Sequence, residues 1–458
     1  MCKTWQVKRI KIAILVCVAL CGVYVMGDVW GVVPGLLTNE PVAGAAQPYP
    51  QVEQRNYGRP KLPDFPDAPA ANAAVISQAI SDLANDSRIT GQVSAVVLDA
   101  QTGAVLAQRE PTRAAEPAST MKLLTAVAAL NELGPDVRLT TSAVVHDTEL
   151  YLVGGGDIML SAGKSNKNAV MGHAGLATLA KNAASELKKL NVEAVAVHVD
   201  GSLFTEPLYH PAMDPENYRY IMEAHPLAVE ISRENQEQHL PDGDMAAAES
   251  FAKSLESNGI TVKTVDRKVA PSNAAQIAKV DSAPVRDLVE FMMRHSDNAV
   301  AETLGHLVAI KSGKPANFAG AAEAVLASLH TQGYPTAGIT IADASGLTKG
   351  NRINTKILSE VLLDLWQCDQ CPLVAASAGM PTSALTGSMH DRFWDTSVRG
   401  RVHAKTGSLP EVSSLAGFVY TDAGRPLAFA VIVDQLEPGT SYSARLLVEH
   451  FVDQIAKA

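Results

Sequence analysis

The chain has 458 residues, of which 47% are hydrophobic and 19% charged, which is the composition of a globular protein with room for about two or three domains. Its formal net charge of −10 argues against nucleic acid as a partner, because binding phosphate groups requires a basic surface. No long basic block lies beyond the first dozen residues.

The N-terminus carries the pattern of an export signal. Its cations are Lys3, Lys8, Arg9 and Lys11. An uncharged apolar run, 12–27, follows them, as in the segments that direct export. The run is shorter than the roughly 20 residues that span a bilayer, but further apolar residues follow it, so an uncleaved anchor stays open. We predict that 1–27 is an export signal or membrane anchor and that the protein is secreted or anchored in the extracytoplasmic cell envelope, with membrane contact only through this segment.

The next segment has the composition of a linker. Seven prolines fall within 38–70, where apolar periodicity is weak. We therefore predict a proline-rich linker over 28–71, with the folded part beginning near Asn72.

The remaining pattern predicts an α+β fold with one inserted domain. Helical spacing over 72–87 is followed by a hairpin pattern. Over 138–283 short strand-like runs alternate with an amphipathic helix, which indicates an inserted accessory domain. Helical patterns resume near 284, and the chain ends with strands in tight succession and a last helix. Such short connections predict an antiparallel sheet, here flanked by helices and built from 72–137 and 284–458.

Only two of the five cysteines, Cys368 and Cys371, lie outside the N-terminal segment. A zinc site would need further ligands at matching spacing, and none is evident. A local disulfide is the favoured interpretation for an exported protein. We predict no cofactor and no metal.

Ser119 lies three positions before Lys122, which opens the most apolar helical pattern of the chain. Residues i and i+3 share a helix face, so the hydroxyl and the amine should lie within hydrogen-bond distance. Burial lowers the proton affinity of an amine, and a neutral amine can activate a hydroxyl as a nucleophile. The spacing alone is weak, because it recurs at Ser185 and Lys188 on an amphipathic helix.

Two further motifs strengthen this interpretation. Ser296-Asp297-Asn298 stands at the seam between two helical patterns, and Lys405-Thr406-Gly407 stands on a predicted strand. Together with Ser119 and Lys122 they are the motif set of penicillin-binding proteins and class A β-lactamases. Over roughly 74–455 the chain resembles the class C low-molecular-mass penicillin-binding proteins, the D-alanyl-D-alanine carboxypeptidase/endopeptidase family. Supporting stretches are GGGD at 154–157, VDGSLF at 199–204 and ADASGLTKGNR at 342–352.

The resemblance implies a penicillin-binding/serine β-lactamase-like transpeptidase fold and assigns the chemistry to four residues. Ser119 is expected to be acylated by the substrate carbonyl, with Lys122 as the proton acceptor. Ser296 is expected to pass the proton to the leaving amine, and Asn298 to hold the peptide backbone.

The third motif is expected to bind the end of the substrate. Lys405 and Thr406 suit the carboxylate of the terminal D-alanine. Gly407 is expected to let the substrate backbone approach the strand. The resemblance further implies an oxyanion hole made by the N–H groups of Ser119 and Ser408.

Substrate side-chain recognition is less well matched to the family. Asp157 is expected to bind the free end of a diamino-acid side chain. Lys349 stands where the family carries an arginine, so the charge is kept but the bidentate geometry is lost.

The resemblance implies an exported serine D,D-peptidase acting on peptidoglycan stem peptides and inhibited by β-lactams. It would cleave the terminal D-Ala-D-Ala bond, the crosslink bond, or both. A serine β-lactamase is one alternative, although 177 positions separate Ser119 from Ser296 and the interval is far shorter in β-lactamases. A catalytically idle wall-binding or penicillin-sensing module is another.

Overall fold

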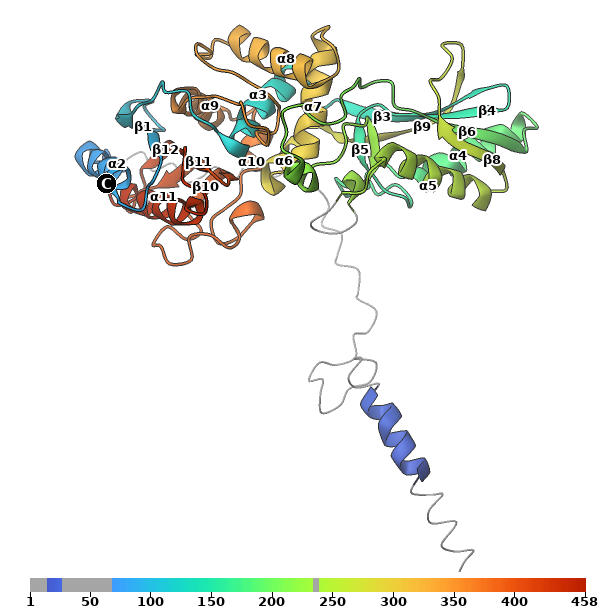
Figure 1. Cartoon of the computed structure of the whole chain (residues 1–458), viewed down its shortest axis with the longest axis horizontal. Helices are drawn as coiled ribbons and strands as arrows, with labels where there is room; N and C mark the ends of the chain where they lie inside the picture. Colours follow the sequence, from blue (N-terminus) through green and yellow to red (C-terminus); the bar gives the residue numbers. More distant parts are fainter. Residues whose placement is uncertain (1–14, 27–67, 234–238) are drawn as a thin grey trace, which may run out of the picture. The chain divides into compact units, whose positions relative to one another are not determined.

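The computed structural model describes residues 15–26, 68–233 and 239–458 (Figure 1). The chain divides into two compact units, 1–64 and 65–458. In the first unit the described part is one helix over 15–26, whose residues are all exposed. Within the described ranges, no helix combines the length and the apolar character needed to cross a membrane. The predicted basic start of the export segment and nearly all of the predicted linker lie outside the described residues.

A five-stranded antiparallel sheet organises one half of unit 65–458, as the sequence predicted. Its order is β10-β11-β12-β1-β2, so strands from the two ends of the unit pair with each other. The strands are β1 (Gln92–Asp99), β2 (Val105–Arg109), β10 (Val402–Leu409), β11 (Val412–Tyr420) and β12 (Pro426–Asp434). Strand β10, which carries the third motif, is therefore an edge strand.

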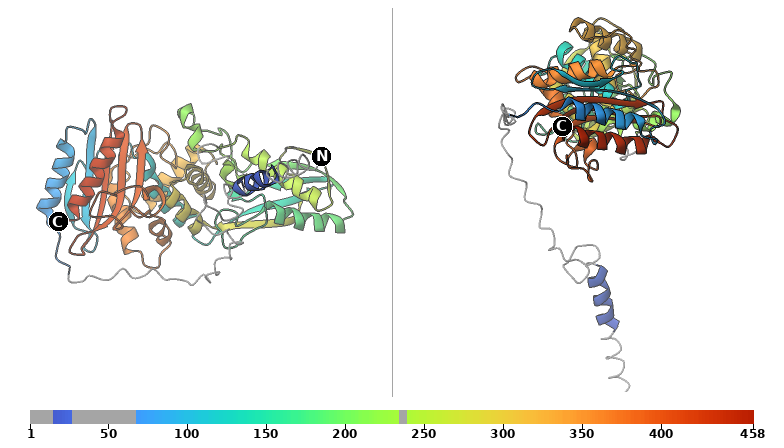
Figure 2. Two further views of the ribbon diagram at one scale, coloured as in Figure 1. Left: turned by 90° about the horizontal axis from the view of Figure 1, so that it is seen from below. Right: turned by 90° about the vertical axis from the view of Figure 1, so that its left-hand side faces the viewer.

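Helices cover both faces of this sheet, because its central strands are apolar on both sides. In β1, Val93 and Val97 pack in one core cluster, whereas Val96 and Leu98 pack in another. The first cluster lies under α2 (Ala73–Asn85) and α11 (Ser441–Ile455), which lie side by side on the outer face (Figure 2). The second cluster is covered by α3 (Lys122–Glu132), α6 (Val285–His295), α7 (Asn298–Lys311), α8 (Phe318–Thr331), α9 (Thr355–Gln367) and α10 (Val374–Ala378).

A second five-stranded sheet lies at the other end of unit 65–458, beyond α6 and α7 (Figure 1). Its order is β8-β6-β4-β3-β9, with β4, β6 and β8 parallel and the other pairs antiparallel. Its strands are β3 (Arg138–His146), β4 (Glu149–Val153), β6 (Ala194–Asp200), β8 (Thr261–Arg267) and β9 (Ala275–Pro284). Helices α4 (Leu176–Lys189) and α5 (Gly243–Ser257) pack on it around a separate apolar core.

The remaining elements of unit 65–458 are short. A two-stranded sheet pairs β5 (Asp157–Leu160) with β7 (Leu227–Val229). The 3-10 turns are η1 (Ala118–Met121), η2 (Pro215–Tyr220), η3 (Glu230–Ser232) and η4 (Gly387–Met389). Cys368 and Cys371 form the predicted disulfide after α9.

Candidate active site

The first motif lies where the chain enters the core. Ser119 is in the 3-10 turn η1, and the α-helix begins only at Lys122, so the serine precedes the helix that the spacing predicted for it. Lys122 is completely buried, whereas Ser119 is half-buried. The Lys122 amine donates to the Ser119 hydroxyl over 3.0 Å, as expected from the i, i+3 spacing.

The Lys122 amine has polar but uncharged partners. It also donates to Oδ1 of Asn298 and to the backbone carbonyl of Ser345, both at 2.7 Å. None of the ion pairs among the described residues involves this amine. Burial therefore lowers the pKa of Lys122 to about 8, against the opposing charges of Asp343, Glu302 and Asp297. An amine with this pKa is neutral in an appreciable fraction of molecules near neutral pH, so it can accept a proton.

The second motif forms the sharp connection between α6 and α7. Ser296 follows the last residue of α6 in a left-handed conformation, with φ of 56°, which is uncommon for a residue with a Cβ. Asp297 caps α7 by accepting from the Val300 N–H and pairs with Arg233. This tight turn presents Ser296 and Asn298 to the same side.

The third motif supplies a second buried amine. Lys405 on β10 is completely buried and donates to the Ser296 hydroxyl and to the Thr406 carbonyl, both at 2.8 Å. Burial, followed by the charges of Lys122 and Arg392, lowers the pKa of Lys405 well below its usual range. Thr406 shares a hydrogen bond of 2.7 Å with Ser388 of η4.

Gly407 is required by packing within the protein. A Cβ at this position would lie 2.2 Å from the Ser414 hydroxyl and 2.7 Å from the Pro117 carbonyl oxygen. The structure thus gives a different reason for this glycine than the approach of a substrate. It lets β10 lie directly against the turn that carries Ser119.

The three motifs meet at one cleft of about 420 Å³, although Lys405, Thr406 and Gly407 are not among the residues that line it. Ser119, Ser296, Asn298 and Ser408 line it, and the two lysines lie behind the serines that they contact. The opposite wall is the η2 turn, and its Tyr220 carbonyl accepts from the Asn298 amide at 2.9 Å. The cleft is thus lined by two hydroxyls that each contact a buried amine, Ser119 with Lys122 and Ser296 with Lys405, an arrangement suited to proton transfer.

The two residues predicted to recognise substrate side chains do not line this cleft. Asp157 is buried at the start of β5, where its carboxylate accepts from the Met159 N–H, and burial raises its pKa to about 7. Lys349 is exposed and lies 3.7 Å from Glu411, next to the Leu409 and Pro410 side of the cleft.

Two contributions to the site were missed by the sequence analysis. The η2 wall comes from a loop-rich stretch without periodicity, so no local signal placed it here. The Ser345 carbonyl is a backbone group and has no signature of its own. One sequence signal for a buried polar network was available. Glu302 lies four residues after Asn298 in an otherwise apolar helix, where an acidic residue needs hydrogen-bond partners.

Comparison with solved structures first defines the class. Penicillin-binding protein 4 of Haemophilus influenzae superposes with a TM-score of 0.67 at 20% identity, covering 83% of this chain and 100% of that one. A peptidoglycan endopeptidase of Bdellovibrio bacteriovorus superposes with a TM-score of 0.52 at 19% identity, covering 79% of this chain and 92% of that one. The fold is thus that of the penicillin-binding proteins.

Sequence comparison then gives the family. The model of the D-Ala-D-Ala carboxypeptidase 3 (S13) family matches residues 76–242 and 227–454, and the chain belongs to this family. A carboxypeptidase of Mycobacterium tuberculosis is 31% identical, with 86% of this chain and 87% of the relative covered. The carboxypeptidase DacB of Mycolicibacterium smegmatis is 32% identical, with coverages of 76% and 77%. The chain is therefore a serine-type D-Ala-D-Ala carboxypeptidase, and its family's action on peptidoglycan implies that it works outside the cytoplasm.

Proposed function

We propose that Ser119 is the nucleophile of this D,D-peptidase and that Lys122 is its base. The observation that carries the proposal is the 3.0 Å contact between the Ser119 hydroxyl and a buried amine whose pKa is lowered to about 8. The neutral amine takes the hydroxyl proton while the serine oxygen attacks the carbonyl carbon of the penultimate D-alanine. The backbone N–H groups of Ser119 and Ser408 are assigned to the oxyanion of the tetrahedral intermediate.

The second hydroxyl–amine pair serves the leaving group. Ser296 lies next to Lys405 at 2.8 Å, so its hydroxyl can donate to the departing amine and recover a proton through this contact. Cleavage leaves the acyl group on Ser119, and water then releases it. Asn298, held between Lys122 and Tyr220, is assigned to the substrate backbone.

The terminal carboxylate is assigned to Lys405 and Thr406, because an amine and a hydroxyl are donors that suit a carboxylate. Strand β10 is an edge strand, so a substrate peptide can align along it. The roles of Asp157 and Lys349 in recognising substrate side chains stay predictions.

The same proposal covers the chain's organisation, location and inhibition. Residues 72–137 and 284–458 form the penicillin-binding catalytic domain, and 138–283 form an accessory domain that contributes the η2 wall. The N-terminal segment acts as export signal or anchor. Penicillins mimic the acyl donor and acylate Ser119, as one Bdellovibrio relative of this fold has been solved in its penicillin G-acylated form.

Labelling with a fluorescent penicillin, followed by peptide mapping, tests the proposal. The wild-type chain should carry the label on the peptide that contains Ser119, and Ser119→Ala should carry none. Ser185→Ala is the matched control, because Ser185 and Lys188 have the same spacing but lie exposed on α4. That variant should label as the wild type does.

Turnover separates the proposal from its alternatives. Purified muropeptides should lose terminal D-alanine or be cut at crosslinks, and bound penicillin should be released slowly. Fast penicillin release without peptide cleavage would instead indicate a β-lactamase. A stable adduct on Ser119 without any peptide turnover would indicate an idle penicillin-sensing module.

A further inference from the structure

Glu302 is a buried acid that the proposed chemistry does not use. It lies on α7 four residues after Asn298, so both side chains are on the same face of the helix. Its side chain is 3% exposed, and none of the ion pairs within the described ranges involves it. A buried carboxyl group needs hydrogen-bond donors to offset the loss of water.

Those donors come from a single backbone segment. The two carboxyl oxygens of Glu302 accept from the N–H groups of Ser345 at 2.8 Å and of Ala344 at 3.2 Å. The next polar atom of this segment, the Ser345 carbonyl oxygen, accepts from the Lys122 amine at 2.7 Å. Glu302 thus holds the residue whose carbonyl oxygen orients Lys122.

Other contacts leave this segment little freedom. Asp343 accepts from the N–H groups of Gly346 and Thr348, both at 2.7 Å. Thr125, on the same helix as Lys122, donates to the Ala344 carbonyl at 2.6 Å. Asp343 and Ser345 are fully buried, so water cannot replace a lost contact.

We propose, on the basis of the function proposed above, that Glu302 is a positioning residue for Lys122, acting through the Ser345 peptide group and through its negative charge. The peptide group fixes where the amine lies relative to the Ser119 hydroxyl. The charge stabilises the ammonium form of Lys122, together with Asp343 from the neighbouring loop and Asp297 at the start of α7, which is paired with Arg233. Lys405 on β10 acts in the opposite sense.

The state of Glu302 itself is set by competing effects. Burial and the charge of Asp343 raise its pKa, whereas the backbone N–H donors favour the ionised form. The geometry supports the carboxylate, since both oxygens accept from backbone N–H groups and the hydrogen bond with the Ser345 side chain also favours the ionised form.

The test is the pH dependence of acylation by a fluorescent penicillin, measured on the full chain between about pH 6 and about pH 9. Glu302→Gln removes the charge, so the midpoint of the rate profile should move to lower pH by about one unit, and the plateau rate should fall at least about tenfold. Glu302→Asp keeps the charge but shortens the side chain, so its midpoint should stay near that of the wild type while its plateau rate falls.

The control is Glu323→Gln on α8, an exposed acid that should leave both quantities unchanged. An unchanged midpoint in Glu302→Gln would overturn the proposal, because a purely structural acid would alter only the rate or the stability. If Glu302→Gln does not fold, a wild-type acylation rate in Glu302→Asp would overturn it equally. Labelling of the wild-type chain at Ser119 in the same experiment tests the proposed function separately.

Discussion

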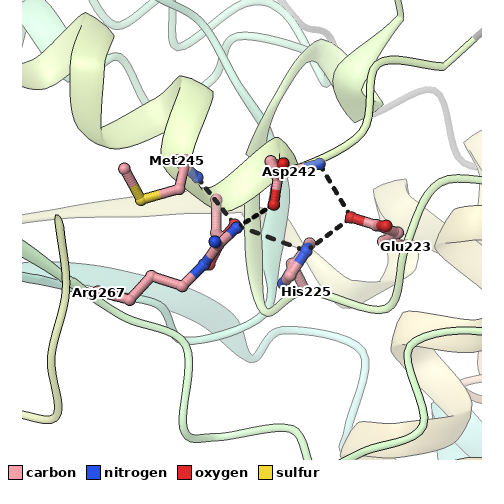
Figure 3. Close-up of polar contacts among 6 residues, drawn as sticks. Glu223, His225, Asp242, Met245 and Arg267 are labelled. Carbon is pink, nitrogen blue, oxygen red and sulfur yellow. Dashed lines mark hydrogen bonds and ion pairs between the residues drawn. The ribbon is translucent and has the colours of Figure 1, made fainter.

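Two groups of cations in the molecule have opposite surroundings: one is fully buried without a charged partner, and the other is half-exposed and paired with carboxylates. In the cleft, Lys122 and Lys405 are fully buried and contact only hydroxyl, amide and carbonyl groups. Beside the second sheet, Arg267 contacts Asp242 and donates twice to the buried Asp244, at 2.7 and 3.0 Å (Figure 3). His225 bridges the same cluster to Glu223, with 3.1 Å between the ring nitrogen and the carboxylate.

The difference appears in the proton affinities. Burial lowers the pKa values of both cleft lysines. In the second cluster burial is the largest effect on Asp244 and opposes its ionisation, but the hydrogen bonds with Arg267, the charges of His225 and Arg267 and the Met245 N–H together lower its pKa. The hydrogen bonds with Asp244 raise the pKa of Arg267. The paired cation thus stabilises the junction of β8 with the start of α5. The cleft amines keep the ability to exchange a proton, which a directly paired cation loses.

The largest effect is expected from Lys122→Met, which removes the base but keeps an apolar side chain of similar length. Acylation by penicillin should slow by about 10²- to 10⁴-fold, the contribution typical of a positioned general base. The free energy of unfolding should stay within about 1 kcal/mol of wild type or rise, because removing the cost of burying the amine offsets the loss of its three hydrogen bonds. Stopped-flow acylation and urea unfolding measure the two quantities.

A marked loss of stability in Lys122→Met, beyond about 2 kcal/mol, would contradict this view. It would mean that the three hydrogen bonds of the amine hold the core together, as the ion pairs of the second cluster do.

Gly407→Ala tests the close packing that brings the nucleophile to β10. The new methyl group would meet the Pro117 carbonyl and force the η1 turn away from the strand. We expect acylation to fall by about 10²-fold, since a displacement of about 1 Å at a reacting group has effects of this size. Gly163→Ala is the control, because a Cβ there meets no atom within 4 Å. Equal rates in both variants would show that the contact does not position Ser119.

The sequence predicted the sheet and the three motifs because these depend on local patterns. Short apolar runs separated by hairpin-length gaps identify β11 and β12, and the break between α6 and α7 is visible as a seam in the helical pattern. Long-range contacts had no such signal. The hydrogen bond from Asn298 to Tyr220 joins segments 78 positions apart. The hydrogen bond that Glu302 accepts from Ser345 comes from a backbone N–H group, which has no sequence signature.

The start of the helix that carries Lys122 also involves a long-range contact that local sequence patterns do not reveal. Helical periodicity placed Ser119 within the helix, but the structure has a 3-10 turn here, in which Ala118 has φ of 47°. Gly346 packs against this turn, since a Cβ there would lie 2.0 Å from the Ala118 carbonyl oxygen. Gly346 is more than 200 positions away along the chain, so no window around Ser119 contains this contact.

The protonation state of Lys122 should control how the acylation rate depends on pH. Only neutral Lys122 can act as base, so the rate should rise about tenfold per pH unit up to a midpoint near pH 8 and then level off. A rate that is flat from about pH 6 to about pH 9 would exclude Lys122 as the base.

The stability of the protein should depend on pH through the same group. The unfolded chain, with an ordinary lysine pKa of 10.5, binds more protons than the folded chain between pH 8 and 10.5, so the contribution of Lys122 to the free energy of unfolding should rise with pH there.

The smallest effect on catalysis is expected from Asp244→Asn in the second cluster. The amide cannot accept both hydrogen bonds from Arg267, and it leaves a half-exposed guanidinium without its buried partner. The free energy of unfolding should fall by about 1 to 3 kcal/mol, as expected when a charged hydrogen-bond partner is lost. This difference from the wild type should become smaller at acid pH, where Asp244 of the wild type is protonated in both the folded and the unfolded chain. Acylation of Ser119 should change by less than about twofold, because Asp244 does not line the cleft. A large loss of acylation with unchanged stability would show instead that this cluster acts on the active site. The effect would pass along the backbone segment that connects His225 and Glu223 to the η2 wall.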